Sequence, residues 1–576
     1  MLQQGLLEYL FTVGIIISFV ALVIGIFKDR KGIWKVLEER GLLGKDLAVV
    51  FAIVALFLFI ELYFIKPTQL LFFDDAIYQA MALTLLHTGQ AWMCNYGNAT
   101  ACFSGQVYHE PIGLSFNMAI AFLFFGANRA TGYGAELFLA ALSVFMSFFA
   151  SLLLLGNRKT AFFTELLMAL SPVVLVWAMP TNSDVAVLAY SLISIFFFLV
   201  FLRRRSLWSF SNMLFSFSLL FYMKVDEIFF IPVFIAFYLL LESKGVIKSL
   251  SDAFKAIKDN FLNTKLLVVV LFFLIAVVPS IMYSYNESMT DGYGWQGTII
   301  QNTCLKGMPP MNVSGEINLM NFKANICANA AFWLDQYKSD YVMQPIAFTA
   351  LAVMGIGMML AMDGYRKKLA AIAIWFGVFF LLYTAFYAGS VIYGVDWRFM
   401  LSLIAPVCML GGFAVAEILD LVGTYANRLG GMSGALNAIA VAAAVVLLFA
   451  PIGLLMPMLS INPSLIQQAG DARFYEGFVY NESRLIPSGC IVYTYDPTLF
   501  QLNNRTATQI DNLYNSSQVG KYMQQYKCLV LDYGYWCHTP NNECTYANQS
   551  FNLVPIATVT YNTLGYNYGF YYIENK

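Results

Sequence analysis

The stretch 171–205, SPVVLVWAMPTNSDVAVLAYSLISIFFFLVFLRRR, holds two apolar runs that are joined by a short polar link and followed by three arginines. Apolar runs of about 20 residues can cross a bilayer as helices, and similar runs recur along the chain. Of the 576 residues, 59% are hydrophobic and only 12% are charged, with a mean hydropathy of +0.67. This composition predicts a polytopic α-helical membrane protein. The net charge of -1 gives no indication of nucleic-acid binding.

About 12 spans are predicted from the apolar runs. They lie near 8–27, 47–66, 134–155, 161–180, 183–202, 209–225, 227–242, 266–285, 344–362, 369–388, 398–420 and 435–460. If these spans alternate in direction, the clusters of Lys and Arg between them all face one side, which the positive-inside rule makes cytoplasmic. Loops 67–133 and 286–343 and the tail 461–576 then face the extracytoplasmic side.

The segment 113–126, GLSFNMAIAFLFFG, is apolar but short for a span. A span here would invert the topology of everything that follows it, so that the later basic clusters would lie outside. We therefore interpret the segment as an interfacial or re-entrant helix, with a true span as the alternative.

Cysteines and glycosylation sequons support the same orientation. Eight of nine cysteines fall on the extracytoplasmic side, where disulfides persist, and only Cys408 lies within a span. The expected pairs are Cys94–Cys102, Cys304–Cys327, Cys537–Cys544 and Cys490–Cys528, although four tail cysteines allow three connectivities. A zinc site in the tail is the alternative, with His538 as its one nearby histidine. The sequons begin at Asn98, Asn286, Asn312, Asn481, Asn504, Asn515 and Asn548.

The tail differs in character from the preceding 460 residues. It is polar, and runs such as CLVLDYGYW and YNYGFYYI alternate with turn residues. We therefore predict a transmembrane domain at 1–460 and a small, disulfide-stapled extracytoplasmic α/β domain at 461–576. The many Tyr and Asn residues of the tail suit sugar binding, but they are also common on ordinary extracellular surfaces.

Several ionisable residues are predicted to lie at the outer ends of the spans, where such groups are functional candidates. They are Asp74, Asp75, His109, Glu110, Asp184, Lys224, Asp226, Glu227, Asp396 and Arg398. Structural alternatives exist for each: Asp74 and Asp75 can complement a helix dipole, and Asp184 can be an N-cap. Lys224 and Arg398 are cations on the side of the membrane where the positive-inside rule expects few, so each needs a local anion or an anionic ligand.

A family resemblance is carried by five segments in a fixed order. They are DDAIYQAMALTLLHTGQ, HEPIGLSFNMAIAFLFFG, NRATGYGAELFLAALSVFMSFFASLLLLG, the stretch 171–205, and MKVDEIFFIPVF. Over about 60–400 the chain resembles polyprenyl-phosphate-sugar-dependent glycosyltransferases of the GT-C fold, in the branch of protein O-mannosyltransferases and aminoarabinose transferases. Oligosaccharyltransferase catalytic subunits share this fold, but the chain has no Trp-Trp-Asp-type motif.

The resemblance implies transfer of a sugar from a polyprenyl phosphate (dolichyl or undecaprenyl) to a protein, lipid or glycan acceptor on the extracytoplasmic face. It implies Asp74 as general base, with Asp75 beside it. Two departures stand out: Asp75 replaces the usual Glu, and His109-Glu110-Pro111-Ile112 stands where a Lys-Pro motif is expected.

The phosphate-binding role therefore passes to Lys224, Arg398 or His109, while Glu110, Asp184 and Tyr78 are candidates for binding the sugar or acceptor. This scheme requires no cofactor or metal, although a divalent ion at Asp74, Asp75 and Asp184 is left open. One rival function is a secondary transporter, which predicts inverted repeats and charges at span midpoints. The other is a silent membrane scaffold that presents the tail as a binding module.

Overall fold

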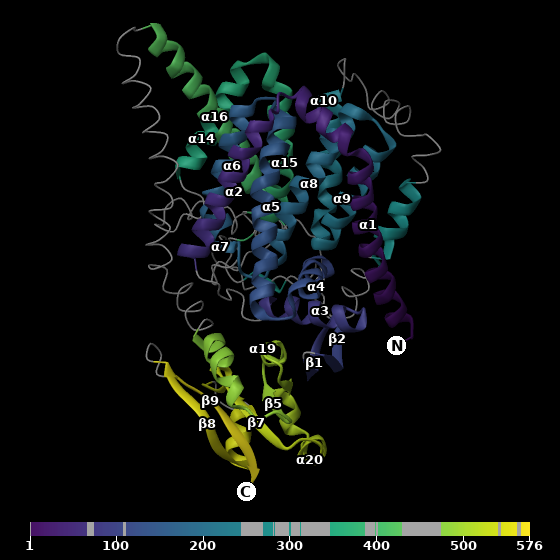
Figure 1. Ribbon diagram of the computed structural model, residues 1–576, viewed down its shortest axis with the longest axis vertical. Helices are drawn as coiled ribbons and strands as arrows, with labels where there is room; N and C mark the ends of the chain where they lie inside the picture. Colours follow the sequence, from purple (N-terminus) through teal and green to yellow (C-terminus); the bar gives the residue numbers. More distant parts are fainter. Residues whose placement is uncertain are drawn as a thin grey trace. The chain divides into compact units, whose positions relative to one another are not determined.

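The computed structural model of the protein is mainly α-helical, with a β-sheet that includes all of the described strands of the tail (Figure 1). It describes residues 2–65, 74–98, 100–107, 111–242, 269–279, 281–282, 299–300, 311–312, 346–385, 398, 401–428, 474–538, 543–561 and 566–576. The chain forms two compact units. The first comprises Met1–Lys66, Leu137–Ala178 and Ser183–Ser464, and the second comprises Pro67–Glu136, Met179–Asn182 and Leu465–Lys576.

The first unit is a bundle of apolar helices. Its main helices are α1 (Leu2–Glu39), α2 (Gly44–Phe64), most of α5 (Arg129–Leu155), α6 (Arg158–Ala169), α7 (Pro172–Trp177), α8 (Ser183–Arg204), α9 (Leu207–Met223), α10 (Phe230–Glu242), α14 (Ile346–Ala361), α15 (Arg366–Ala385) and α16 (Leu401–Arg428). In the described part of the chain, five helices are long and apolar enough to cross a membrane, or six if the bent pair Ala347–Ala361 and Asp363–Leu382 is one span. The protein is therefore a multi-pass membrane protein.

Most predicted spans coincide with helices, but the one expected at 161–180 is divided. Helix α6 ends at Ala169, and α7 begins at Pro172 after a break at Leu170 and Ser171. Proline has no N–H to continue the helical hydrogen bonds, but it fits the first turn of a new helix. At about 1.5 Å per residue, the 12-residue α6 is too short to span a bilayer alone. The span expected at 435–460 lies outside the described residues.

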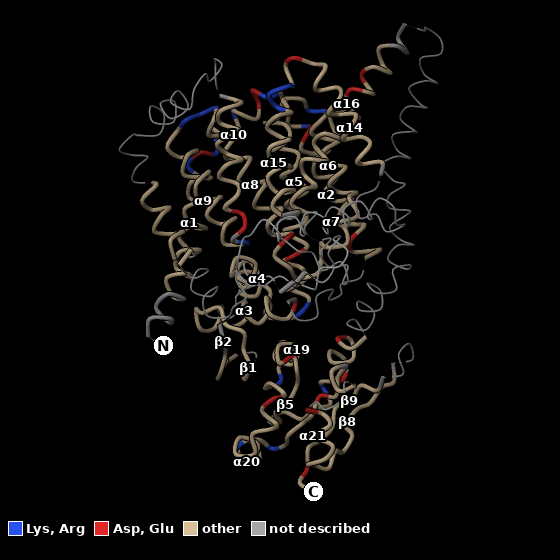
Figure 2. The backbone as a smooth tube through the Cα atoms, turned by 180° about the vertical axis from the view of Figure 1, so that it is seen from behind, with Lys and Arg blue, Asp and Glu red and all other residues tan. Residues whose placement is uncertain are grey.

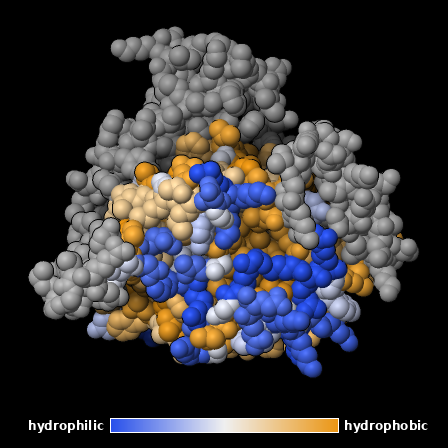
Figure 3. Space-filling view, turned by 90° about the horizontal axis from the view of Figure 1, so that it is seen from above, coloured by the Kyte–Doolittle hydropathy of each residue, from blue (hydrophilic) through white to orange (hydrophobic). Residues whose placement is uncertain are grey.

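Basic residues gather at one end of the helical unit (Figure 2). Arg158 pairs with Asp46 across 3.1 Å, and the Lys368 ammonium donates to the Leu155 carbonyl at 2.7 Å. A view onto this end shows hydrophilic residues spread over the face (Figure 3). The described basic connections therefore share one end, as the alternation of spans predicts.

The second unit contains a seven-stranded mixed sheet of order β2-β1-β6-β5-β7-β9-β8. Its strands are β1 (Trp92–Asn98), β2 (Ala101–Val107), β5 (Cys490–Thr494), β6 (Thr506–Gln509), β7 (Cys528–Tyr533), β8 (Phe551–Tyr561) and β9 (Tyr566–Asn575). The described helices are α3 (Asp74–Thr88), α4 (Ile112–Phe125), α19 (Pro497–Leu502), α20 (Ser516–Gln525), α21 (Glu543–Ser550) and one over 474–482. The strand-like runs of the tail form β7 and β9, so a β-rich carboxy-terminal domain exists.

The hairpin β1–β2 comes from the first large loop, yet it extends the sheet of the tail. Strand β1 pairs antiparallel with β6, with Tyr96 opposite Thr508. The Tyr96 and Tyr526 hydroxyl oxygens are 2.5 Å apart, and the Gln501 amide donates to the Cys94 carbonyl at 3.2 Å. Because one sheet cannot lie on both sides of a bilayer, this pairing places the loop and the tail on the same side.

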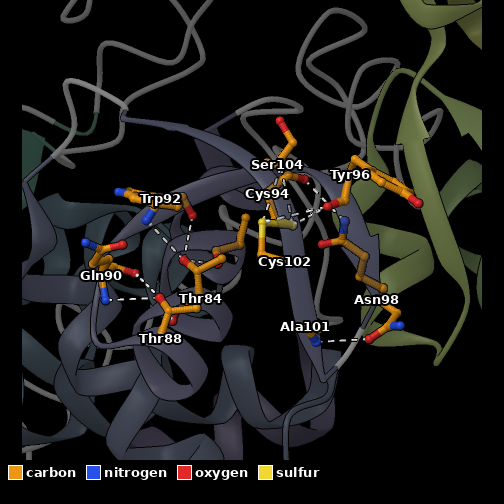
Figure 4. Close-up of a disulfide and its surroundings, with 12 residues drawn as sticks. Thr84, Thr88, Gln90, Trp92, Cys94, Tyr96, Asn98, Ala101, Cys102 and Ser104 are labelled. Atoms are coloured by element: carbon orange, nitrogen blue, oxygen red, sulfur yellow. Dashed lines mark hydrogen bonds between the residues drawn. A yellow bond between two sulfur atoms is a disulfide. The ribbon is translucent and has the colours of Figure 1, made fainter. Parts of the chain in front are cut away.

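Disulfides tie down both parts of this sheet. Cys94–Cys102 joins β1 to β2, beside the hydrogen bonds that Thr84 makes with the Trp92 backbone (Figure 4). Cys490–Cys528 joins the neighbouring parallel strands β5 and β7, and Cys537–Cys544 closes a short loop. These are pairings expected from the sequence, whereas Cys304 and Cys327 lie outside the described residues. Cys408 is a free, buried thiol in α16.

Helix α4 contains most of the segment 113–126, which is apolar but short for a membrane span. Its 14 residues extend about 21 Å, short of the roughly 30 Å hydrocarbon core of a bilayer. Gly126, at a φ of +84°, caps the helix. Leu114 and Met118 are buried, while Phe124 and Phe125 are exposed. An interfacial or re-entrant position remains our prediction for this helix.

Candidate functional site

Two cationic side chains converge on one carboxylate in the helical unit. The Lys224 ammonium donates to Asp184 Oδ1 at 2.9 Å, and Arg398 Nε lies 3.4 Å from Asp184 Oδ2. The Asp184 side chain is 2% exposed, whereas Lys224 and Arg398 are 13% and 22% exposed. The structure thus brings together three predicted site residues that lie far apart in the chain.

Local structure explains why these side chains meet. Asp184 lies in the first turn of α8, where a carboxylate complements the positive end of the helix dipole. Lys224 has an extended backbone that ends α9 and precedes the short 3-10 helix Val225–Phe229. Asp226 and Glu227 of that turn are also buried. A Lys–Arg pair held at one point suits a phosphate group, which would compete with Asp184 for both cations.

The cluster lies at the opposite end of α8 from the basic connections. Arg203 and Arg204 end this 22-residue helix, which is about 33 Å long. Arg204 pairs there with Asp29 across 3.5 Å. The two groups of cations are therefore separated by about the thickness of a hydrocarbon core.

Asp75 belongs to the second unit and lies in the first turn of α3. Its side chain is fully buried. Thr181 donates its hydroxyl to the Asp75 backbone carbonyl at 2.8 Å and is 3.3 Å from Asp75 Oδ1. The Gln79 amide donates to Thr181 at 3.5 Å. Thr181 thus orients the carboxylate, and it precedes Asp184 by only three positions in the chain.

The remaining predicted site residues are described in part or not at all. Asp74 begins α3, but its side chain lies outside the described residues, as do His109 and Glu110. Tyr78 is buried, and its backbone carbonyl accepts from the Ser115 hydroxyl at 3.0 Å. Within the described ranges, no group of three or more His, Cys, Asp or Glu residues is arranged to hold a metal ion.

Sequence reasoning missed a second polar group in the unit that contains Asp75. Arg129 forms an ion pair with Glu476, and the Tyr133 hydroxyl donates to the same carboxylate at 2.9 Å. The Arg129 guanidinium also lies 5.3 Å from the centre of the Tyr133 ring. A Cβ at Gly132 would come within 3.1 Å of the Gln79 side chain, so Gln79 packs against this turn of α5. The signal in the sequence was Arg129 itself, a cation at the predicted outer end of a span.

Comparison with known proteins finds similarity in structure alone. No family model and no curated protein matches the chain. ArnT from Cupriavidus metallidurans in the apo state is 13% identical over 92% of this chain and 97% of its own, with a TM-score of 0.50. The same protein bound to undecaprenyl phosphate is 11% identical over 92% and 97%, with a TM-score of 0.51.

A further match is the archaeal oligosaccharyltransferase AglB from Archaeoglobus fulgidus, in complex with an inhibitory peptide and a dolichol-phosphate. It is 11% identical over 91% of this chain and 74% of that chain, with a TM-score of 0.47. At these identities only the fold is comparable, and the two ArnT structures carry that comparison. The chain therefore shares the fold of these ArnT structures, in agreement with the GT-C fold expected from the sequence.

Proposed function

We propose that the protein is a membrane glycosyltransferase that moves a sugar from a polyprenyl phosphate, dolichyl or undecaprenyl, to a protein, lipid or glycan acceptor. The observation that carries this proposal is the convergence of Lys224 and Arg398 on Asp184, about 33 Å along α8 from the basic connections. A phosphate on a lipid carrier lies at the bilayer surface, which is the level of such a cluster. ArnT, which shares the fold, was solved bound to undecaprenyl phosphate.

We place the reaction on the extracytoplasmic face. The basic connections lie at the other end of the helical unit, and cations favour the cytoplasmic side. The first loop and the tail share one sheet, which contains the disulfides Cys94–Cys102 and Cys490–Cys528. Disulfides persist in oxidising compartments, so this sheet supports an extracytoplasmic location for α3 and its carboxylates.

The proposed step is a displacement at the anomeric carbon. The carboxylate of Asp74, with Asp75 beside it, takes the proton from an acceptor hydroxyl or amine, whose oxygen or nitrogen forms the new glycosidic bond. The bond between the anomeric carbon and the phosphate oxygen breaks, and its electron pair leaves with the lipid phosphate. Lys224 and Arg398 stabilise the charge that develops on that phosphate. Attack opposite the leaving group inverts the anomeric centre.

The remaining residues have binding roles in this proposal. Asp184, Tyr78 and Glu110 contact the sugar or the acceptor, and His109 is a further candidate for the phosphate. Asp184 also holds the two cations in place when no donor is bound, because it pairs with both.

Binding of the lipid phosphate tests the proposed role of the cations. Detergent-purified protein is titrated with undecaprenyl phosphate and dolichyl phosphate, and the bound lipid is counted by native mass spectrometry. Loss of a charge-assisted hydrogen bond is worth roughly 1.5–3 kcal/mol, so we expect Lys224→Met to weaken binding by about tenfold or more. Lys224→Arg retains the charge, and Lys368→Met changes a lysine at the other end of the bundle. Equal binding by Lys224→Met and Lys368→Met contradicts the assignment.

A further inference from the structure

The order of the parallel strands in the tail defines an edge at which ligands bind in other α/β sheets. Strand β5 lies between β6 and β7 and runs parallel to both. The chain leaves β5 for β6 on one side and then crosses to β7 on the other side. Beyond the carboxyl ends of β5 and β7 is therefore the topological switch point, where open α/β sheets hold their ligands.

A buried carboxylate with an unpaired oxygen lies at this switch point. Asp532 of β7 is fully buried, and its Oδ2 accepts from the Tyr475 hydroxyl and, at 2.7 Å, from the Thr494 hydroxyl at the end of β5. In the described part of the chain, Oδ1 of Asp532 has no hydrogen-bond partner. Burial of an unpaired carboxylate oxygen is costly, so the arrangement favours a ligand that supplies a donor.

An aromatic surface adjoins this carboxylate. Tyr495, directly after β5, is 43% exposed, and its ring is backed by Trp536 with centroids 5.6 Å apart and planes 31° from parallel. Trp536 in turn meets the Tyr475 ring edge-on at 5.3 Å. A Cβ at Gly534 would come within 2.4 Å of the Trp536 ring, so a glycine is needed there. Tyr495 is thus an exposed ring on a rigid support.

A second carboxyl follows that ring in the chain. Asp496 is partly buried and caps α19 by accepting from the Thr498 backbone N–H at 3.2 Å. The Thr494 hydroxyl, which donates to Asp532, also accepts from the Asp496 backbone N–H at 3.1 Å, so Asp496 and Asp532 contact the same hydroxyl. Among the described residues, neither is paired with Lys or Arg, which disfavours an anionic ligand.

We propose that this edge of the sheet binds a neutral saccharide. The apolar face of a pyranose ring stacks on Tyr495, and adjacent hydroxyls donate to the carboxyls of Asp496 and Asp532. Carboxylates match vicinal hydroxyl donors, and an aromatic ring beside a few placed polar groups is the usual composition of a small-molecule site. This site is separate from the proposed transfer reaction, and neither depends on the other.

Saturation-transfer NMR on the full-length protein in detergent tests the proposal. The probes are mannose, glucose, galactose, N-acetylglucosamine and short neutral oligosaccharides of each. We expect at least one to bind, with Tyr495→Ala weakening it by about tenfold, the size of one lost stacking contact. Asp496→Asn also weakens binding but preserves the helix cap, since Asn caps as well as Asp. Tyr495→Phe keeps the ring and is expected to bind like the wild type.

Tyr480→Ala is the matched control, because Tyr480 is an exposed tyrosine, at 59%, in the helix over 474–482 of the same unit. Circular dichroism establishes that each variant is folded. The proposal is overturned if no saccharide binds to the folded wild type. It is also overturned if Tyr495→Ala and Asp496→Asn bind the saccharide as tightly as Tyr480→Ala does.

Discussion

Replacement of Asp532 by Asn should change how the stability of the tail domain depends on pH. Burial is the main reason that the pKa of Asp532 rises from 3.8 to about 7; hydrogen bonds from Tyr475 and Thr494 oppose this rise, and the nearby Asp496 charge adds to it. Between these two values the folded state keeps a proton that the unfolded chain has released. Stability therefore falls as pH rises through this window, by about 4 kcal/mol for Asp532 in total.

Asparagine at 532 removes this titration but leaves an acceptor for Tyr475 and Thr494. Its amide N–H₂ then occupies the position of the unpaired Oδ1, at a cost of roughly 1–3 kcal/mol. We therefore expect Asp532→Asn to be less stable than the wild type at pH 4 and more stable at pH 8. A reversal of sign between two pH values cannot arise from a general packing defect.

Hydrogen exchange measured by mass spectrometry on peptides that cover β5 and β7 gives the local free energy of opening at each pH. The rates are corrected for the pH dependence of chemical exchange. Glu574→Gln, at an exposed carboxylate in the same domain, is the control and should leave the difference between pH 4 and pH 8 nearly unchanged. The reasoning is refuted if Asp532→Asn has the same pH dependence as the wild type.

Three further predictions concern contacts within the second unit. Thr181→Val should lower turnover roughly fivefold, which corresponds to the loss of a hydrogen bond worth about 1 kcal/mol, and it should shift the pH profile of the reaction. Thr181→Ser keeps the hydroxyl and should restore both the turnover and the profile. An unchanged pH profile in Thr181→Val means that Thr181 does not act on Asp75. Replacement of Cys490 and Cys528 by Ala removes their disulfide and should reduce the unfolding free energy of the tail domain by about 2–4 kcal/mol. Hydrogen exchange measures this change, and equal protection of β7 with and without the disulfide would contradict it. Glu476→Gln keeps an acceptor for Tyr133 but leaves Arg129 without its charged partner, so the hydrogen-exchange rate of the helix over 474–482 should increase. Glu482→Gln, at the end of the same helix, is the control. Equal exchange rates in the two variants would argue against the ion pair.

Local sequence patterns predicted the helices well because span length and charge position are local properties. The apolar run expected at 183–202 forms α8 at Ser183–Arg204. Asp184 and Lys224, each predicted to lie at the outer end of a span, contact each other in the structure. The break at Ser171–Pro172 was missed, although a proline in the middle of an expected span is a readable sign of one.

Contacts between distant segments could not be read from the chain. The pairing of β1 with β6 joins residues about 400 positions apart, and no local sequence pattern indicates which two strands will pair. For the same reason the ion pair between Arg129 and Glu476 could not be predicted from the sequence, since Glu476 lies in a polar stretch without a distinguishing motif.

Transfer of a labelled sugar tests the central claim most directly. Wild-type protein in proteoliposomes is given radiolabelled polyprenyl-phosphate sugars with candidate acceptors, beside Asp74→Asn, Asp75→Asn and the control Asp363→Asn, an exposed carboxylate between α14 and α15. We predict that the wild type and Asp363→Asn release one polyprenyl phosphate per sugar transferred. A lost general base lowers the rate by about 100-fold or more, so Asp74→Asn should be nearly inactive and Asp75→Asn impaired. Equal transfer by all four proteins, or label that crosses the bilayer while still attached to its lipid, would contradict the account.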